Sequence, residues 1–107
     1  MPTATETRTD QQTRVDRLTP WNVVLLNDDD HTYEYVIRML GDLFGAPRPQ
    51  AFKLARTVDS QGRAIVATTH RELAELKRDQ IHGYGRDPLL AESAGSMTAT
   101  IEPAEGG

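Results

Sequence analysis

Apolar residues recur along the first half of the chain in two patterns, one typical of a strand and one typical of a helix. Residues 21–27 are rich in aromatic and β-branched side chains, and the turn-forming run 27–30 follows them directly. Apolar residues then recur at steps of three and four over about 33–44, with Thr32 placed to cap the helix and Gly45 at its end. This half of the chain predicts a strand, an acidic loop and a helix.

The second half of the chain predicts four further elements. A stripe of apolar residues over 51–58, ended by the turn-forming residues 60–62, predicts a short second helix. Residues 63–68 are typical of a second strand, and a third helix is expected from residue 69 or 70 to about residue 81. After a polar loop, residues 96–102 alternate in size and polarity like a last strand.

The predicted order of elements is β-α-α-β-α-β, within a domain covering residues 20–104. This order most simply gives an α+β fold, a two-layer sandwich with a three-stranded antiparallel sheet and three helices on one face. The polar residues 1–19 predict a disordered N-terminal arm, and residues 105–107 predict a loose tail. Because one small core leaves little room for an enclosed catalytic cavity, we expect a surface groove that binds a partner and no enzyme activity.

Composition and charge narrow the class of partner. The chain has 107 residues, with 12 Lys and Arg against 16 Asp and Glu, and a net charge of −4 disfavours nucleic acid. With no Cys and three scattered His, the sequence predicts no disulfide, no metal site and no cofactor. No apolar run approaches the ~20 residues of a membrane span, and the N-terminus carries no secretory signal, so we expect a cytoplasmic protein that is not bound to a membrane.

The acidic loop after the first predicted strand has several interpretations. The simplest is a solvated turn, because Asn and Asp favour turns and helix N-termini. Asp28, Asp30 and Thr32 also have the spacing of the D-x-D-x-T motif of haloacid-dehalogenase-type phosphatases, but no later acidic pair accompanies them. Metal binding by Asp28, Asp30 and His31 is disfavoured because neighbours in an extended loop point apart. A fourth interpretation is a cleft in which Asn27 and Asp28 accept hydrogen bonds from an ammonium group.

Several short motifs occur together in the predicted domain. Residues 21–29 read Trp-Asn-Val-Val-Leu-Leu-Asn-Asp-Asp, residues 34–36 read Glu-Tyr-Val, and residues 61–64 read Gln-Gly-Arg-Ala. The aliphatic-aliphatic-Asn-Asp-Asp motif is specific when Gln-Gly-basic-Ala follows it, and both are present. This combination resembles the ClpS family, the bacterial adaptors that carry N-degron substrates to the ATP-dependent Clp protease. The resemblance extends over the whole predicted domain.

The resemblance implies a small pocket for the first side chain of a substrate, typically Leu, Phe, Tyr or Trp, with the substrate's α-amino group bound at the rim. Asn27 and Asp28 fall on the amine-binding positions, and Asp59 stands where the family has a histidine that helps to bind the amine. The residues of the hydrophobic pocket would be Tyr33, Val36, Ala55, Val58 and Met97. Tyr33 and Ala55 each replace a family methionine, so one change adds bulk to the pocket and the other removes it.

The resemblance also implies a partner, the N-terminal domain of a Clp AAA+ ATPase of the ClpA or ClpC type. Glu72 and Lys77 match positions at which the family contacts this domain, and Asp30 replaces an aromatic residue of the same contact. The leading hypothesis is therefore a non-enzymatic adaptor that delivers N-degron proteins to a Clp unfoldase–protease. The alternative is a ClpS-like regulator that docks on the ATPase but has lost N-degron binding.

Overall fold

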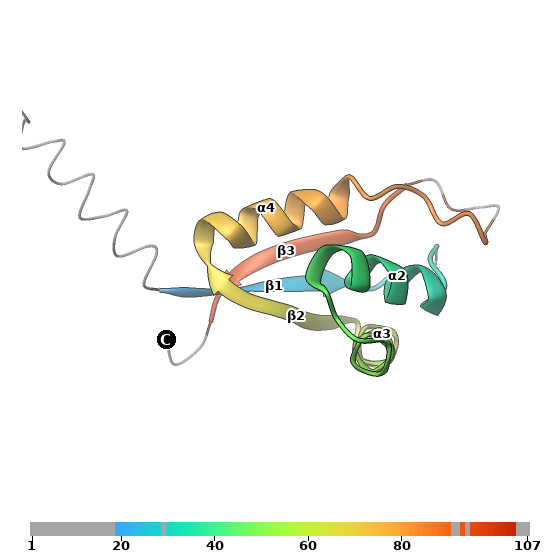
Figure 1. The fold of residues 1–107 in the computed structure, drawn as a ribbon, viewed down its shortest axis with the longest axis horizontal. Helices are drawn as coiled ribbons and strands as arrows, with labels where there is room; N and C mark the ends of the chain where they lie inside the picture. The colour runs from blue at the N-terminus through green and yellow to red at the C-terminus, as the bar shows by residue number, and fades with distance from the viewer. Residues whose placement is uncertain (1–18, 29, 91–92, 94, 105–107) are drawn as a thin grey trace, which may run out of the picture.

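The computed structural model describes residues 19–28, 30–90, 93 and 95–104, so the predicted arm and tail lie outside the described residues, apart from Thr19. No helix within these ranges is long and apolar enough to cross a membrane. The elements follow the predicted order (Figure 1): β1 (Pro20–Leu26), α2 (Tyr33–Phe44), α3 (Arg48–Gln61), β2 (Arg63–His70), α4 (Arg71–His82) and β3 (Thr98–Pro103). The α+β class and the order of elements are confirmed.

The three strands form one antiparallel sheet in the order β2-β1-β3, with β1 in the centre (Figure 1). Val23 and Leu25 of β1 have no exposed surface and point into the core, against residues of all three helices. Val24 points to the opposite face, where its neighbours are Ile65 of β2 and Thr100 of β3. The helices therefore cover one face of the sheet, as the alternation of side chains along a strand requires.

The second helix is longer than predicted, which corrects the expectation of a short helix over 51–58. It has 14 residues and begins at Arg48, with Pro49 in its first turn. Proline is tolerated there because the first N–H groups of a helix have no intrahelical partner. The helix ends at Gly62, whose φ of 85° favours a residue without a side chain. The apolar stripe marks only the buried middle of this helix, so it underestimated its length.

The bounds of the other elements are close to the predicted ones. Helix α2 begins after Thr32, whose hydroxyl accepts a hydrogen bond from the Tyr35 N–H, and Gly45 ends it with a φ of 66°. Helix α4 follows His70, which caps it. Strand β2 continues to His70, beyond the predicted end, and β3 begins at Thr98 instead of residue 96. Met97 therefore precedes the last strand, where its side chain is buried in the core.

Candidate functional site

The acidic loop after β1 lies against the C-terminal end of α3. The N–H of Asn27 donates to the carbonyl oxygen of Gly62 at 3.0 Å, which joins the end of β1 to the residue that terminates α3. Tyr33, the first residue of α2, donates its hydroxyl to Asp59 in the last turn of α3 at 2.7 Å. Asn27, Asp28, Tyr33 and Asp59 are called the loop–helix junction below. The sequence separates these residues by up to 32 positions, and the Asn27–Gly62 bond together with the packing of α2 on α3 joins the loop to the helix.

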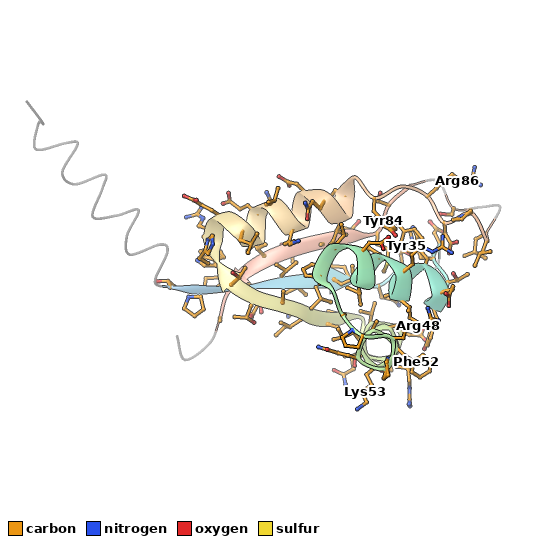
Figure 2. The ribbon with its side chains drawn as sticks, viewed as in Figure 1. Tyr35, Arg48, Phe52, Lys53, Tyr84 and Arg86 are labelled. Carbon is orange, nitrogen blue, oxygen red and sulfur yellow. The ribbon has the colours of Figure 1, made fainter. Side chains whose placement is uncertain are left out.

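Tyr33 is the best-defined part of the loop–helix junction. Its ring contacts Phe52 edge-on, with 5.7 Å between the ring centres, and Figure 2 shows Phe52 on α3. The hydrogen bond to the Asp59 carboxylate, with a smaller contribution from burial, raises the pKa of the Tyr33 hydroxyl. The Tyr33 side chain therefore stays protonated, and it contacts two residues of α3 that lie about two helical turns apart, Phe52 and Asp59. Both aromatic residues keep substantial exposed surface, 36% for Tyr33 and 44% for Phe52.

Asp28 is bound to His31, whose ring is almost completely buried. The His31 Nδ1 atom lies 2.7 Å from Asp28 Oδ1, and its Nε2 atom lies 2.7 Å from the carbonyl oxygen of Gly95. Asp28 Oδ1 also accepts a hydrogen bond from the Asp30 N–H at 2.9 Å. These bonds orient the Asp28 carboxylate, while its second oxygen accepts no hydrogen bond from the described residues. That oxygen is available to a ligand.

Asp87 connects the loop after α4 to the start of α2. It is fully buried and accepts hydrogen bonds from the N–H groups of Thr32, at 2.6 Å, and Leu89, at 2.8 Å. Burial by itself would raise the pKa of Asp87, but hydrogen bonds from these N–H groups and from the Thr32 hydroxyl outweigh it, and the pKa lies below its ordinary value. Asp87 is therefore a carboxylate anion. Its bond to Thr32 fixes the start of α2, and with it the position of Tyr33.

Replacing Asp87 by Asn is expected to lower the free energy of unfolding at pH 7 by about 1 kcal/mol, because a neutral amide accepts these bonds more weakly. A carboxyl whose folded pKa is depressed stabilises the fold above its unfolded pKa of about 4 and loses this contribution as the pH falls through the folded value. Urea unfolding of both proteins from pH 7 to pH 3 measures the difference, which should shrink with acid. A difference that stays constant over this range would contradict the lowered pKa of Asp87. The control is Asp79→Asn, which changes an exposed aspartate on α4.

The residues predicted for the hydrophobic pocket gather in one place. They come from α2, α3 and the segment before β3, and all of them except the exposed Tyr33 belong to the buried apolar cluster of the core. Their exposed fractions are 5% for Val36, 3% for Ala55, 2% for Val58 and 3% for Met97. Tyr33 crosses the outer side of α3 between Phe52 and Asp59, one helical turn on either side of Ala55. In this structure the predicted pocket is therefore part of the packed core, next to the ring of Tyr33.

The three residues predicted to dock on the Clp ATPase do not form one cluster. Asp30 follows β1, whereas Glu72 lies in the first turn of α4, directly after β2. Because β1 and β2 are antiparallel, with Leu26 opposite Arg63 and Pro20 opposite His70, the two acids lie at opposite ends of the sheet. The third residue, Lys77, donates to the carbonyl oxygen of Leu43 at 2.5 Å and lies over the ring of Phe44.

Three residues that support the loop–helix junction were not predicted from the sequence. The sequence offers His31 as a possible metal ligand, but a histidine three residues after an aspartate in a turn can also pair with it locally, as it does here. Asp87 sits in an irregular loop and gives no periodic signal. Phe52 lies outside the buried apolar stripe of α3 and is exposed. A large apolar residue outside the stripe is the one sequence signal for a contact on this side of the helix. Among the described residues, no group of three or more His, Asp or Glu side chains could hold a metal ion.

The fold is a small α+β domain in which the loop after β1 is hydrogen-bonded to the end of α3. Comparison with known proteins gives the family. Residues 16–92 match the family described as ATP-dependent Clp protease adaptor protein ClpS. The chain belongs to the ClpS family.

Individual relatives agree with this assignment. The ATP-dependent Clp protease adapter protein ClpS of Ruegeria sp. (strain TM1040) is 38% identical over 73 residues, which cover 68% of this chain and 65% of that protein. The protein of the same name from Roseobacter denitrificans (strain ATCC 33942 / OCh 114) is 38% identical over 66 residues, covering 62% of this chain and 58% of that protein. The matched part thus spans less than two thirds of either relative.

A solved structure is similar over most of the chain. The structure of Agrobacterium tumefaciens ClpS2 bound to L-phenylalaninamide superposes with a TM-score of 0.70 at 27% sequence identity. The match covers 80% of this chain and 98% of the other. The β-α-α-β-α-β domain is therefore an adaptor fold that, in this relative, binds an amino acid amide with a bulky apolar side chain.

Proposed function

We propose that this protein is an adaptor that binds proteins with a bulky hydrophobic N-terminal residue and delivers them to an ATP-dependent Clp unfoldase–protease. The observation that carries the proposal is the loop–helix junction, where Asn27 is bonded to Gly62 at the end of α3 and Tyr33 is bonded to Asp59, which follows the buried Val58. An N-terminal residue presents the matching pair of groups, an ammonium and an apolar side chain. Phenylalaninamide, which the Agrobacterium relative binds, has the same two groups.

The hydrogen bond between Tyr33 and Asp59 implies an exchange of partners on binding. The substrate ammonium has three N–H donors, and Asn27, Asp28 and Asp59 supply acceptors, with the free oxygen of Asp28 available at once. At Asp59 the ammonium replaces the Tyr33 hydroxyl, because the ammonium carries a positive charge and adds the attraction of opposite charges to the hydrogen bond with the carboxylate. Movement of the released Tyr33 ring opens the way to Val36 and Ala55 for the first side chain of the substrate.

The proposed partner is the N-terminal domain of a Clp AAA+ ATPase of the ClpA or ClpC type, in the cytoplasm. Glu72 is exposed at the start of α4 and is free to take part in this contact. Lys77 keeps its bond to the Leu43 carbonyl and contributes positive charge on the same helix. Because Asp30 lies at the other end of the sheet, we place the main contact on α4 and assign Asp30 no part in it.

The test is a titration of fluorescent peptides that differ only in their first residue. We expect tight binding of peptides beginning with Leu, Phe, Tyr or Trp, and weak binding of peptides beginning with Ser or Gly. A parallel assay then follows degradation of a Leu-initiated protein by ClpAP or ClpCP with and without the adaptor. Equal binding of all first residues would reject the proposed function.

The alternative function, a regulator that docks on the Clp ATPase without binding N-degrons, has one observation in its favour. The predicted pocket residues are buried, and Tyr33 is bonded across the place where a substrate would enter. A protein of this kind would change the ATPase or degradation rate of the Clp machine and show no first-residue preference in the peptide titration. The two assays together separate the adaptor from the regulator.

A further inference from the structure

The outer surface of α3 carries a hollow next to the loop–helix junction. It measures about 330 Å³ and is lined by Lys53, Arg56, Thr57 and Ser60, with no acidic residue among them. Figure 2 shows Lys53 projecting from α3 away from the rest of the molecule. Asp59 directly precedes Ser60, one of the lining residues of the hollow, on the same helix. A patch of two cations is unusual here because the chain as a whole has a net charge of −4.

Lys53 and Arg56 differ from most other cations in the described ranges because neither takes part in an ion pair there. Four arginines have a carboxylate partner, and these are Arg48 with Glu34, Arg63 with Glu102, Arg71 with Glu75 and Arg78 with Asp79. Asp59, one turn from Arg56, accepts the Tyr33 hydroxyl instead. Within the described residues, the positive charges of Lys53 and Arg56 are therefore available to a partner.

The position of this patch relative to Asp59 fits the residues that follow a bound N-terminus. Along a helix, Arg56 lies about 4.5 Å before Asp59 and Phe52 about 10 Å before it. Each residue of an extended peptide spans about 3.5 Å. A peptide whose amino group binds Asp59 and whose chain runs along α3 toward Arg48 would bring its second and third residues over Arg56, Lys53 and the exposed ring of Phe52.

We propose that Lys53 and Arg56 form a second subsite, which favours an acidic side chain at the second or third position of the substrate. This inference rests on the proposed function and refines the class of substrate. The binding site would then have two regions of opposite charge. Asp28 and Asp59 bind the ammonium of the substrate, and Lys53 and Arg56 bind the carboxylate of its second or third residue. Like charges repel, so a Lys or Arg at these positions is disfavoured.

The experiment uses the full chain and three labelled peptides that begin Leu-Glu-Glu, Leu-Gln-Gln or Leu-Lys-Lys and are otherwise identical. The Glu peptide is expected to bind about 3- to 10-fold more tightly than the Lys peptide at low salt, and the ratio should fall as salt is added. The variant Lys53→Gln/Arg56→Gln should abolish this ratio, and Lys53→Glu/Arg56→Glu should reverse it.

A matched control places the same change of charge elsewhere. Arg38 and Arg86 line a separate hollow with Tyr35 and Tyr84, and Figure 2 shows Arg86 on the opposite side of the view from Lys53. Arg38→Glu/Arg86→Glu should keep the parent order of the three peptides. If it abolishes the order as fully as the α3 variant, net charge is responsible and the subsite is rejected.

The outcomes also separate this inference from the proposed function. If the parent discriminates Leu from Ser at the first position but binds the Glu and Lys peptides equally, the subsite is wrong and the adaptor function stands. If the parent shows no preference at the first position, the proposed function fails. Because Lys53 and Arg56 are exposed, both α3 variants should keep the circular dichroism spectrum of the parent.

Discussion

Asp59→Ala is expected to weaken binding of a peptide with a free N-terminal amine by about 1–3 kcal/mol, the cost of losing a hydrogen bond to a charged group. The only hydrogen bond that Asp59 accepts from a described side chain comes from Tyr33, so the folded protein loses little when the carboxylate is removed. The loss should therefore fall on the ligand. Fluorescence anisotropy with a Leu-initiated peptide measures it, and thermal unfolding should give nearly the same midpoint for both proteins.

The amine is identified by repeating the titration with an N-acetylated peptide. Acetylation removes the positive charge, so this peptide should bind the parent poorly and lose little more in Asp59→Ala. Equal losses for the free and the acetylated peptide would show that Asp59 does not contact the amine. Asp79→Ala removes an exposed aspartate from α4, far along the chain from the junction, and should leave both affinities unchanged.

Tyr33→Phe is expected to strengthen binding of Leu-initiated peptides by about 2- to 10-fold, because the substrate no longer has to break a hydrogen bond to reach Asp59. Tyr33→Ala should go further and raise affinity for peptides beginning with Ile or Val by about tenfold, since removal of the ring leaves room for a branched Cβ. Titrations of Leu, Ile and Val peptides against the three proteins measure both effects.

The control removes another tyrosine hydroxyl that is bonded to an aspartate. Tyr84 donates to Asp42, and burial together with this bond raises its pKa to about 12, so it is a protonated donor like Tyr33. Tyr84→Phe should leave peptide affinity unchanged. Weaker binding by Tyr33→Phe would contradict the exchange at Asp59, because it would mean that the hydroxyl contributes to the bound state. An unchanged ratio of Leu to Ile affinity in Tyr33→Ala would place Tyr33 outside the pocket entrance.

The fold could be predicted in detail where the signal is local. The apolar period of α2, its Thr32 cap and its Gly45 terminator lie within one stretch of chain, and the structure has the helix where they place it. The length of α3 could not be predicted in this way because only its middle faces the core. Its first turn contains a proline that interrupts the pattern, although proline at this position is compatible with a helix.

The residue types of the candidate site were also evident from the sequence. An Asn-Asp pair after a buried strand left an ammonium site as one of several interpretations, and the resemblance to the ClpS family implied the apolar pocket and the role of the acid at the end of the second helix. These roles stay predictions, since they depend on a ligand. The sequence determines which groups each side chain can bind, because this depends only on the identity of the residue at that position.

Tertiary packing alone decided which of these groups meet. The angle of α2 on α3 sets the Tyr33 hydroxyl 2.7 Å from Asp59, and the loop before β3 brings the Gly95 carbonyl to His31 across 64 positions of sequence. Neither distance is encoded in a period or a short motif. Hydrogen bonds of this kind depend on differences of a few tenths of an ångström between elements that are far apart in the chain, and only the packed core sets the positions of those elements.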